Sequence, residues 1–313
     1  MEIQETEVRS RFRSDFRLLT SSMANFFSRK SYLFKAGDRA LALGERTAVM
    51  GILNVTPDSF SDQGLYFAPE AAVDRAWQIA GEGADILDIG GESTRPGSLG
   101  VSAEEESRRV MPILEALANG TRYPIPISVD TSKAEVARAA LERGACIIND
   151  ISSLQRDPAL GLEAAKHRAG VVLMHMRGTP ANMQSIAPST DILGDIDIWA
   201  KEAVARAQAA GIPSDRIVLD PGIGFGKTAD QNLEIIANLH RLAEAGFPIL
   251  MGTSRKSFIG AIAKKPAGER VLGTGATVAA SIIYGAHMVR VHDVAAIREI
   301  ADVTDAIVRF AKP

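Results

Sequence analysis

Eight short apolar runs, regularly spaced along the chain, constrain its fold more than any other feature. They occupy residues 47–53, 85–90, 125–130, 146–149, 171–176, 216–220, 248–252 and 287–291. The segments between them repeat apolar residues at helical spacing, as Val73, Ala76 and Ala80 do. Strands that alternate with helices form parallel sheets, and eight is the number that closes a barrel. The pattern predicts an α/β chain with a (β/α)8 TIM-barrel fold, and a doubly wound open sheet is the alternative.

Local signals support the expected helix boundaries. Ser102 with Glu105, and Ser132 with Glu135, match the capping-box pattern of helix starts. Glycine, which suits the left-handed turn at a helix end, recurs between each helical segment and the next apolar run. These glycines are Gly83, Gly120, Gly144, Gly170, Gly211, Gly246 and Gly285.

The chain divides into an N-terminal extension and one catalytic domain. Residues 1–31 carry mixed charge and several arginines, and we interpret them as a solvated or loosely docked extension. Turn signals at 37–38 and 44–45 predict a hairpin over residues 32–46. The barrel domain, which includes the hairpin, then spans residues 32–313, a length that a single barrel can occupy.

Charge and composition restrict the partners. The formal net charge of −3 gives no reason to expect a nucleic acid. There is no apolar run of about 18 residues, so we expect no membrane span. Cys146 is the only cysteine, which excludes an intrachain disulfide and fits a reducing compartment. We therefore expect a cytoplasmic protein that acts on small molecules.

Polar groups follow every apolar run, at the point where each expected strand ends. In chain order they are Asn54, Asp88, Asp130, Asn149, Asp150, His175, Asp220, Arg255, Lys256, Arg290 and His292. Some of them must pair with one another, because burying such groups without partners costs several kcal/mol each. The carboxyl ends of barrel strands are also where active sites are built. The pattern therefore predicts an active site at this end.

Two long loops lie at the same end of the expected barrel. Residues 54–68 and 91–101 are rich in Gly, Ser, Pro and Asp. Long ordered loops in compact domains often serve as lids, and a disordered connector is the alternative.

Two segments resemble known motifs but lack the residues or the spacing that those motifs require. Residues 222–228 resemble a phosphate-binding P-loop, but the position of its first glycine is Pro221, so Lys227 is not a P-loop lysine. His175 has no neighbouring His or Cys at metal-ligand spacing, which argues against zinc.

The residue types at the strand ends indicate the ligand chemistry. The cations Arg255, Lys256 and Arg290, with His292, follow the last two runs, where barrel enzymes often hold phosphate. Asn54, with Asp58 and Asp62 nearby, offers the hard oxygen ligands that Mg²⁺ shares with substrate phosphates. The acceptors Asp130, Asn149 and Asp220 match the adjacent N–H donors of an amino-pyrimidinone ring. The sequence thus predicts an enzyme acting on a phosphorylated, nitrogen-rich small molecule.

At these residues the chain resembles the dihydropteroate synthase family. The resemblance rests on eight motifs in the family's order: MGILNVTPDSFSD (50–62), GGESTRPG (90–97), SVDTSK (128–133), IINDIS (147–152), LMHMRGTPANMQ (173–184), LDPGIGFGKT (219–228), SRKSFIG (254–260) and VRVHDV (289–294). It implies that 4-aminobenzoate is joined to 7,8-dihydropterin-6-ylmethyl diphosphate in folate biosynthesis, with pyrophosphate leaving alongside Mg²⁺. It also implies a homodimer and a sulfonamide target.

The same resemblance assigns roles to individual residues. Asp130, Asn149, Asp220 and Lys256 would hold the pterin, with Met174 packing beside it. The diphosphate would be held by Asn54, Thr94, Arg290 and His292, and Asn54 would also hold Mg²⁺. The aminobenzoate would contact the residues Phe60, Pro96, Phe225 and Ser257. The catalytic set is then Asn54, Thr94, Arg95, Lys256, Arg290 and His292.

One departure and two rival interpretations remain. The first loop of the family commonly reads SDGG, and here Gln63 replaces the first of these glycines, which bears on loop closure and on the response to sulfonamides.

A pterin-dependent methyltransferase would have no diphosphate to hold. A non-catalytic pterin-binding paralogue would have lost loop or phosphate residues. The synthase is favoured by the retained residues Asn54, Thr94, Arg95, Arg290 and His292.

Overall fold

The barrel predicted from the sequence is present in the structure. A computed structural model describes residues 29–56, 69–119 and 122–310. The barrel strands are β3 (Ala48–Asn54), β4 (Ile86–Gly90), β5 (Ile127–Asp130), β6 (Ile147–Asp150), β7 (Gly170–Met174), β8 (Ile217–Asp220), β9 (Leu250–Met251) and β10 (Met288–Val291). They pair in parallel in the order β8-β7-β6-β5-β4-β3-β10-β9, and a bridge between Leu219 and Ile249 joins the two edges. This closure confirms the TIM barrel over the open sheet.

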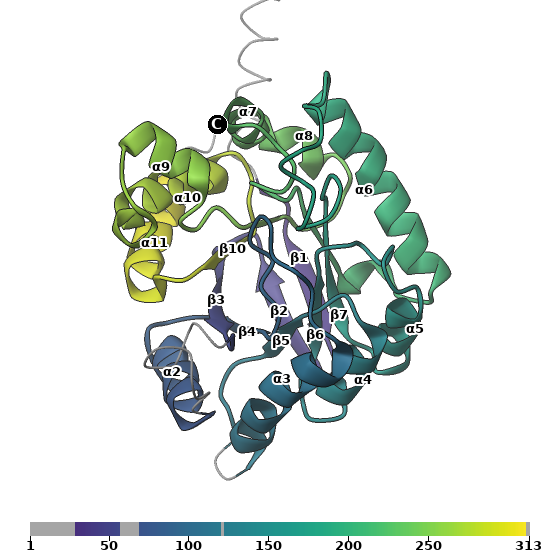
Figure 1. Cartoon of the computed structure of the whole chain (residues 1–313). Coiled ribbons are helices and arrows are strands. Elements are labelled where there is room, and N and C mark those ends of the chain that lie inside the picture. The colour runs from purple at the N-terminus through teal and green to yellow at the C-terminus, as the bar shows by residue number, and fades with distance from the viewer. Residues whose placement is uncertain (1–28, 57–68, 120–121, 311–313) are drawn as a thin grey trace, which may run out of the picture.

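Helices surround the strands, as Figure 1 shows. They are α2 (Pro69–Gly81), α3 (Ala103–Ala118), α4 (Ala134–Leu141), α5 (Ala159–Lys166), α6 (Ile192–Ala209), α7 (Ala229–Ala237), α8 (Leu239–Ala243), α9 (Ser257–Ala263), α10 (Val271–Ile283) and α11 (Val294–Phe310). Every residue of β4 and of β7 is buried, which explains why these strands read as near-continuous apolar runs. Within the described ranges, none of the helices is long and apolar enough to cross a membrane.

One of the two expected helix caps is confirmed and the other is wrong. Ser102 caps α3, because its side chain accepts a hydrogen bond from the Glu105 amide at 3.1 Å. Helix α4 instead begins after Lys133, which provides no side-chain cap. Its first amide, that of Ala134, donates to the Asp157 carboxylate at 2.8 Å. A carboxylate from a later loop therefore replaces the cap expected from Ser132.

The hairpin closes the amino-terminal end of the barrel. Strands β1 (Tyr32–Ala36) and β2 (Arg39–Leu43) pair antiparallel. The hairpin residues Phe34, Ala36 and Leu43 share an apolar cluster with strand residues Ala48, Met50, Ile86, Ile147, Val172, Val218, Leu250 and Met288. The Phe34 ring packs so closely on Gly170 that a Cβ there would lie 2.5 Å from it. The opposite end, where the strands finish, is left for a site.

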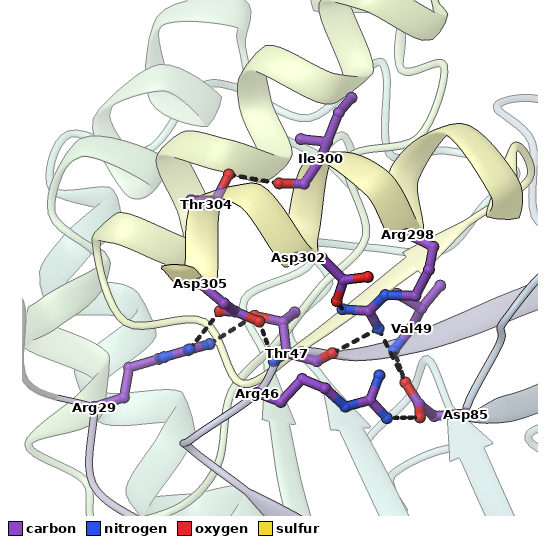
Figure 2. Close-up of polar contacts among 10 residues, drawn as sticks. All are labelled: Arg29, Arg46, Thr47, Val49, Asp85, Arg298, Ile300, Asp302, Thr304 and Asp305. Atoms are coloured by element: carbon purple, nitrogen blue, oxygen red, sulfur yellow. Dashed lines mark hydrogen bonds and ion pairs between the residues drawn. The ribbon is translucent and has the colours of Figure 1, made fainter. Parts of the chain in front are cut away.

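A buried ion pair fastens the segment before β1 to the last helix (Figure 2). An Arg29 amino group lies 2.5 Å from a carboxylate oxygen of Asp305, and the two side chains are only 4% and 2% exposed. The same carboxylate accepts from the backbone N–H of Thr47 at 2.7 Å and from its hydroxyl at 2.8 Å. Arg298 donates to the Thr47 carbonyl at 3.0 Å. One network thus joins Arg29, the start of β3 and α11.

Candidate active site at the carboxyl ends of the strands

A buried network around Arg290 lies at the carboxyl ends of the strands. The Arg290 Nε donates to Asp88 at 2.6 Å, and its Nη2 donates to Asp130 at 2.8 Å. The amide of Asn149 donates to the same Asp88 oxygen at 3.1 Å. Four strands, β4, β5, β6 and β10, therefore meet through their side chains. The barrel brings together three residues that the sequence predicts for substrate binding: Asp130, Asn149 and Arg290.

Asp88 is the member of this network that was not among the expected binding residues. It is fully buried, and its carboxylate fixes both Arg290 and Asn149. Its position was visible in the sequence, since it interrupts the apolar run 85–90. Its role was not visible, because Arg290 lies 202 residues further along the chain. The Asp88 carboxylate therefore positions two of the predicted binding groups, Arg290 and Asn149.

Burial and neighbouring charges together set the pKa values of Asp130 and Arg290. Desolvation raises the pKa of Asp130 to about 7, against the lowering effect of Arg290 and with a further rise from Asp88. Burial also disfavours the charge of Arg290, but the carboxylates of Asp88 and Asp130 outweigh this and raise the Arg290 pKa. The guanidinium thus stays charged, and burial makes the Asp130 carboxylate easier to protonate than that of a free aspartate.

Asp220, which is buried, and Lys256, which is half-buried, carry opposite charges that influence each other. Burial raises the pKa of Asp220 to about 6, although its hydrogen bond from the Gly222 amide, at 2.7 Å, and the charge of Lys256 oppose the rise. Burial lowers the pKa of Lys256 to about 8, against the raising effect of Asp220. The Lys256 ammonium lies 4.0 Å from the centroid of the Phe225 ring.

An apolar wall lies beside these charges. It consists of the buried residues Ile151, Met174, Met183 and Phe225, with Met176 packed against them. A wall of this kind next to carboxylate acceptors suits a flat heterocycle, whose faces are apolar and whose edges carry N–H donors. The predicted pairing of Met174 with the polar residues Asp220 and Lys256 is consistent with this arrangement.

His292 and Arg255 differ in their surroundings. The His292 Nδ1 lies 2.9 Å from the Ser254 hydroxyl. Burial lowers the pKa of His292 to about 4, with the charge of Arg290 as the next cause, so its imidazole is neutral at pH 7. Arg255 donates two hydrogen bonds to Asp293, at 2.9 and 2.5 Å. In this structure Arg255 is thus part of an ion pair between neighbouring loops, and its grouping with the phosphate-binding cations stays a prediction.

Asn54 lies next to this network, at the end of β3. A Cβ placed at Gly90 would lie 3.6 Å from the Asn54 amide oxygen and 3.9 Å from the Asp130 Oδ2, so both oxygens flank this glycine. Across the part of the chain that the structure describes, no three His, Cys, Asp or Glu side chains are grouped to hold a metal ion. A cation here would therefore rely on a small number of hard protein oxygens.

The residues predicted for the second loop and for aminobenzoate contact differ in their exposure to solvent. Arg95 and Pro96 are exposed, and Thr94 is half-buried, in the loop after β4. That loop is tied to the one after β7, because the Gly97 amide donates to the Pro180 carbonyl at 2.9 Å. Ser257 is exposed at the start of α9. The remaining predicted residues, which lie outside the described part of the chain, are Phe60, Gln63, Asp58 and Asp62.

The comparison with known proteins assigns this architecture to a family. The model of the pterin binding enzymes matches residues 50–292, a span that runs from β3 to just past the end of β10. The chain belongs to the pterin-binding enzyme family. The resemblance to dihydropteroate synthases is confirmed as well, because the matched relatives carry that name.

Several relatives show how far the similarity extends. The dihydropteroate synthase of Synechocystis sp. is 48% identical over 267 residues, which cover 85% of this chain and 92% of the relative. That of Escherichia coli is 46% identical over 246 residues, covering 79% and 86%. The matches span most of each relative, so the similarity is to the whole enzyme.

Solved structures agree with the sequence relatives. Dihydropteroate synthase from Yersinia pestis, in a complex with a sulfonamide drug, superposes with a TM-score of 0.82 at 42% identity and covers 88% of this chain and 98% of that one. The Xanthomonas albilineans enzyme with 4-aminobenzoic acid gives 0.81 at 43% identity, covering 89% and 98%. This pterin-binding enzyme therefore shares both sequence and barrel with dihydropteroate synthases.

Proposed function

We propose that this chain is a dihydropteroate synthase, which joins 7,8-dihydropterin-6-ylmethyl diphosphate to 4-aminobenzoate in folate biosynthesis and releases pyrophosphate. One observation carries the proposal: Arg290, Asp130 and Asn149 meet in one network at the barrel mouth, within a span that matches this family. Relatives named dihydropteroate synthase support the reaction. A structure of one such enzyme with 4-aminobenzoic acid supports the second substrate.

The pterin is assigned to the acceptors on β5, β6 and β8. A carboxylate can accept from two adjacent N–H groups, as an amino-pyrimidinone ring presents them. Asp220 uses one oxygen for the Gly222 amide and keeps the other for the ligand. Asp130 and Asn149 supply further acceptors and a donor, and Lys256 adds a cation. Met174 contributes an apolar surface to the ring.

The diphosphate is assigned to Arg290 and His292, together with Asn54 and Thr94. Arg95, next to Thr94 in the loop after β4, belongs to the proposed catalytic set. Two N–H groups of Arg290 bind Asp88 and Asp130, which leaves others of the guanidinium for phosphate oxygens. His292 is a neutral donor when the Ser254 hydroxyl donates to its Nδ1, because the proton then lies on Nε2. Charge developing on the leaving diphosphate is stabilised by these fixed donors.

Mg²⁺ fits the residues present. Mg²⁺ in such sites takes one or two protein oxygens and completes its shell with waters and substrate phosphates. The amide oxygen of Asn54, beside the Asp130 carboxylate, is a donor set of that size. Asn54 would hold the ion, which when bound neutralises charge on the diphosphate.

The proposed reaction is a dissociative displacement. The bond between the pterin methylene carbon and the diphosphate oxygen breaks first, and the electron pair leaves with the diphosphate. The conjugated pterin and the surrounding carboxylates stabilise the resulting cation. The neutral amine of 4-aminobenzoate then attacks the methylene carbon and loses a proton. A strong general base is not required for this step. The proposed contacts of the aminobenzoate are Phe60, Pro96, Phe225 and Ser257.

A cytoplasmic homodimer is part of the proposal. Val303, Ile307 and Phe310 form an exposed apolar face on α11, and Phe310 is 91% exposed. Leu272 on α10, the helix that packs against α11, is 83% exposed. An apolar face of this kind marks an interaction surface, and a second copy of the chain is the proposed occupant. The single Cys146 supports the reducing compartment.

The test is to follow pyrophosphate release from the pterin diphosphate with and without 4-aminobenzoate. We expect release that depends on the amine and that yields one dihydropteroate per pyrophosphate. A pterin-binding paralogue without activity would bind the pterin but release nothing. A pterin-dependent methyltransferase would show no amine-dependent release either, and would bind pterins that lack the diphosphate.

A further inference from the structure

The loop after β8 lies backbone to backbone against the segment after β7. Three of its glycines have left-handed backbone angles: Gly222, Gly224 and Gly226 have φ values of +67°, +83° and +66°. A Cβ at Gly222 would lie 1.9 Å from the His175 carbonyl oxygen, and one at Gly226 would lie 2.5 Å from the Arg177 carbonyl oxygen. Only glycine permits an approach this close.

Lys227 binds this loop from within. Its ammonium donates to the carbonyl oxygens of Gly222 at 2.8 Å, Phe225 at 3.1 Å and His175 at 3.2 Å. An ammonium has three donors and no acceptor, so three carbonyls match its capacity. The ion pairs of the described residues do not include Lys227, so its direct partners are the three carbonyls, and the Asp220 carboxylate favours its charge from further away. Burial lowers the pKa of Lys227 to about 7, although Asp220 opposes this.

The same loop carries groups that face the proposed ligands. The Gly222 amide donates to Asp220. The Phe225 ring contacts the Lys256 ammonium and forms part of the apolar wall. The Gly224 amide donates to the Asn232 side chain at 2.7 Å, a second anchor of the loop on α7. Interactions that hold this loop in place therefore also hold the Phe225 ring in place.

We propose that Lys227 is a positioning residue for the aminobenzoate pocket: its ammonium joins the loops after β7 and β8 and so holds Phe225 against Lys256. The inference rests on the proposed function. The pterin acceptors Asp130, Asn149 and Asp220 lie on strands of the barrel, so strand pairing holds their backbone. Of the two carboxylates, only Asp220 feels the charge of Lys227, which favours its ionised form. Loss of the ammonium is therefore expected to affect the amine substrate more than the pterin.

The test compares both substrates in Lys227→Met, which keeps the length of the side chain and removes its donors. Losing hydrogen bonds worth about 1 kcal/mol each should raise the KM for 4-aminobenzoate about tenfold or more. The Kd of the pterin diphosphate, measured by calorimetry, should stay within about threefold. Lys227→Arg, which keeps a cationic donor in a different shape, should give an intermediate KM. Lys201→Met, on the exposed face of α6, is the control for removal of a lysine charge and should match the unaltered protein.

Asn232→Ala keeps the proposal testable if Lys227→Met does not fold. It removes the second anchor of the loop, together with the hydrogen bond from Asn232 to the Thr228 carbonyl, and leaves Lys227 in place. It should raise the KM for 4-aminobenzoate by about threefold with the pterin Kd unchanged. An unchanged aminobenzoate KM in folded Lys227→Met would overturn the proposal. So would an equal loss of affinity for both substrates, which indicates general destabilisation. Failure of the proposed function is distinct, because the unaltered protein would then form no dihydropteroate.

Discussion

At the scale of single residues, the site depends on buried carboxylates whose neighbours differ. Asp88 binds Arg290 and Asn149, whereas Asp220 accepts from the Gly222 amide and is the proposed acceptor for a ligand. Asp130, Asn149 and Asp220 could be predicted as binding residues because each ends an apolar run. The roles of Asp88 and Lys227 could not, because each acts on groups that only the fold brings near.

Asp88→Asn should weaken catalysis without removing the side chain. The neutral amide oxygen is a poorer acceptor for the Arg290 guanidinium, and hydrogen bonds to charged groups are worth about 1.5–3 kcal/mol. We expect kcat/KM to fall about 10- to 100-fold. Ser128→Ala is the matched control, since Ser128 pairs with Asp88 across β4 and β5 and its hydroxyl has no partner within the described residues. Equal effects of the two variants would show that Asp88 acts only through packing.

Pterin affinity should rise with pH through the range in which Asp220 ionises. Its pKa is raised from 3.8 to about 6, so the folded protein holds this proton more tightly than the unfolded chain. The contribution of Asp220 to stability is therefore full below about pH 4 and is lost as the pH rises through about 6. Ligand N–H groups require the ionised form, so binding has the opposite dependence. Calorimetry of pterin binding between about pH 5 and 8 should show this rise. The Asp220→Asn variant should bind the pterin weakly at every pH, and at about pH 8 its melting temperature should be no lower than that of the unaltered protein.

At the scale of helices and strands, the order and type of the elements could be predicted from the sequence. The residues that cap the helices were predicted less accurately. The apolar runs located all eight barrel strands because each strand is buried on both faces. The predicted cap of α4 was wrong because the first amide of this helix, that of Ala134, donates to Asp157, which lies 23 residues further along the chain. A local pattern such as Ser132 with Glu135 cannot report a partner that another loop supplies.

The two serines provide a direct comparison. Ser102→Ala should reduce the free energy of unfolding by about 1 kcal/mol, because the Glu105 amide loses its acceptor. Ser132→Ala should cost less than about half of that, since α4 does not depend on Ser132 as a cap. Urea denaturation of both variants measures the difference. A larger loss for Ser132→Ala would restore the capping-box interpretation.

At the scale of the whole molecule, the two ends of the barrel have separate tasks. The hairpin and the Arg29–Asp305 pair close the amino-terminal end, and the Arg290 network occupies the other. The barrel and the location of its site were predictable because strand ends converge in this fold. The contact between Arg29 and α11 was not, because the two lie 276 residues apart in the sequence.

Arg29→Met should destabilise the protein while sparing its chemistry. Breaking a buried pair by removing one partner costs about 3–5 kcal/mol, because Asp305 is left buried without its cation. We expect a lower urea midpoint and an unchanged kcat at temperatures where the variant is folded. A kcat that falls in parallel with stability would indicate that the two ends of the barrel are coupled.

The most direct test of the account is the kcat/KM of Arg290→Gln, measured together with its free energy of unfolding. The glutamine amide can still donate to Asp88, but it carries no charge for the departing diphosphate. Loss of a fixed donor to a developing anion typically costs about 10²–10³ in rate. We expect a loss of that size, with a smaller loss of stability than is expected for Arg29→Met. Activity within about twofold of the unaltered protein would contradict it.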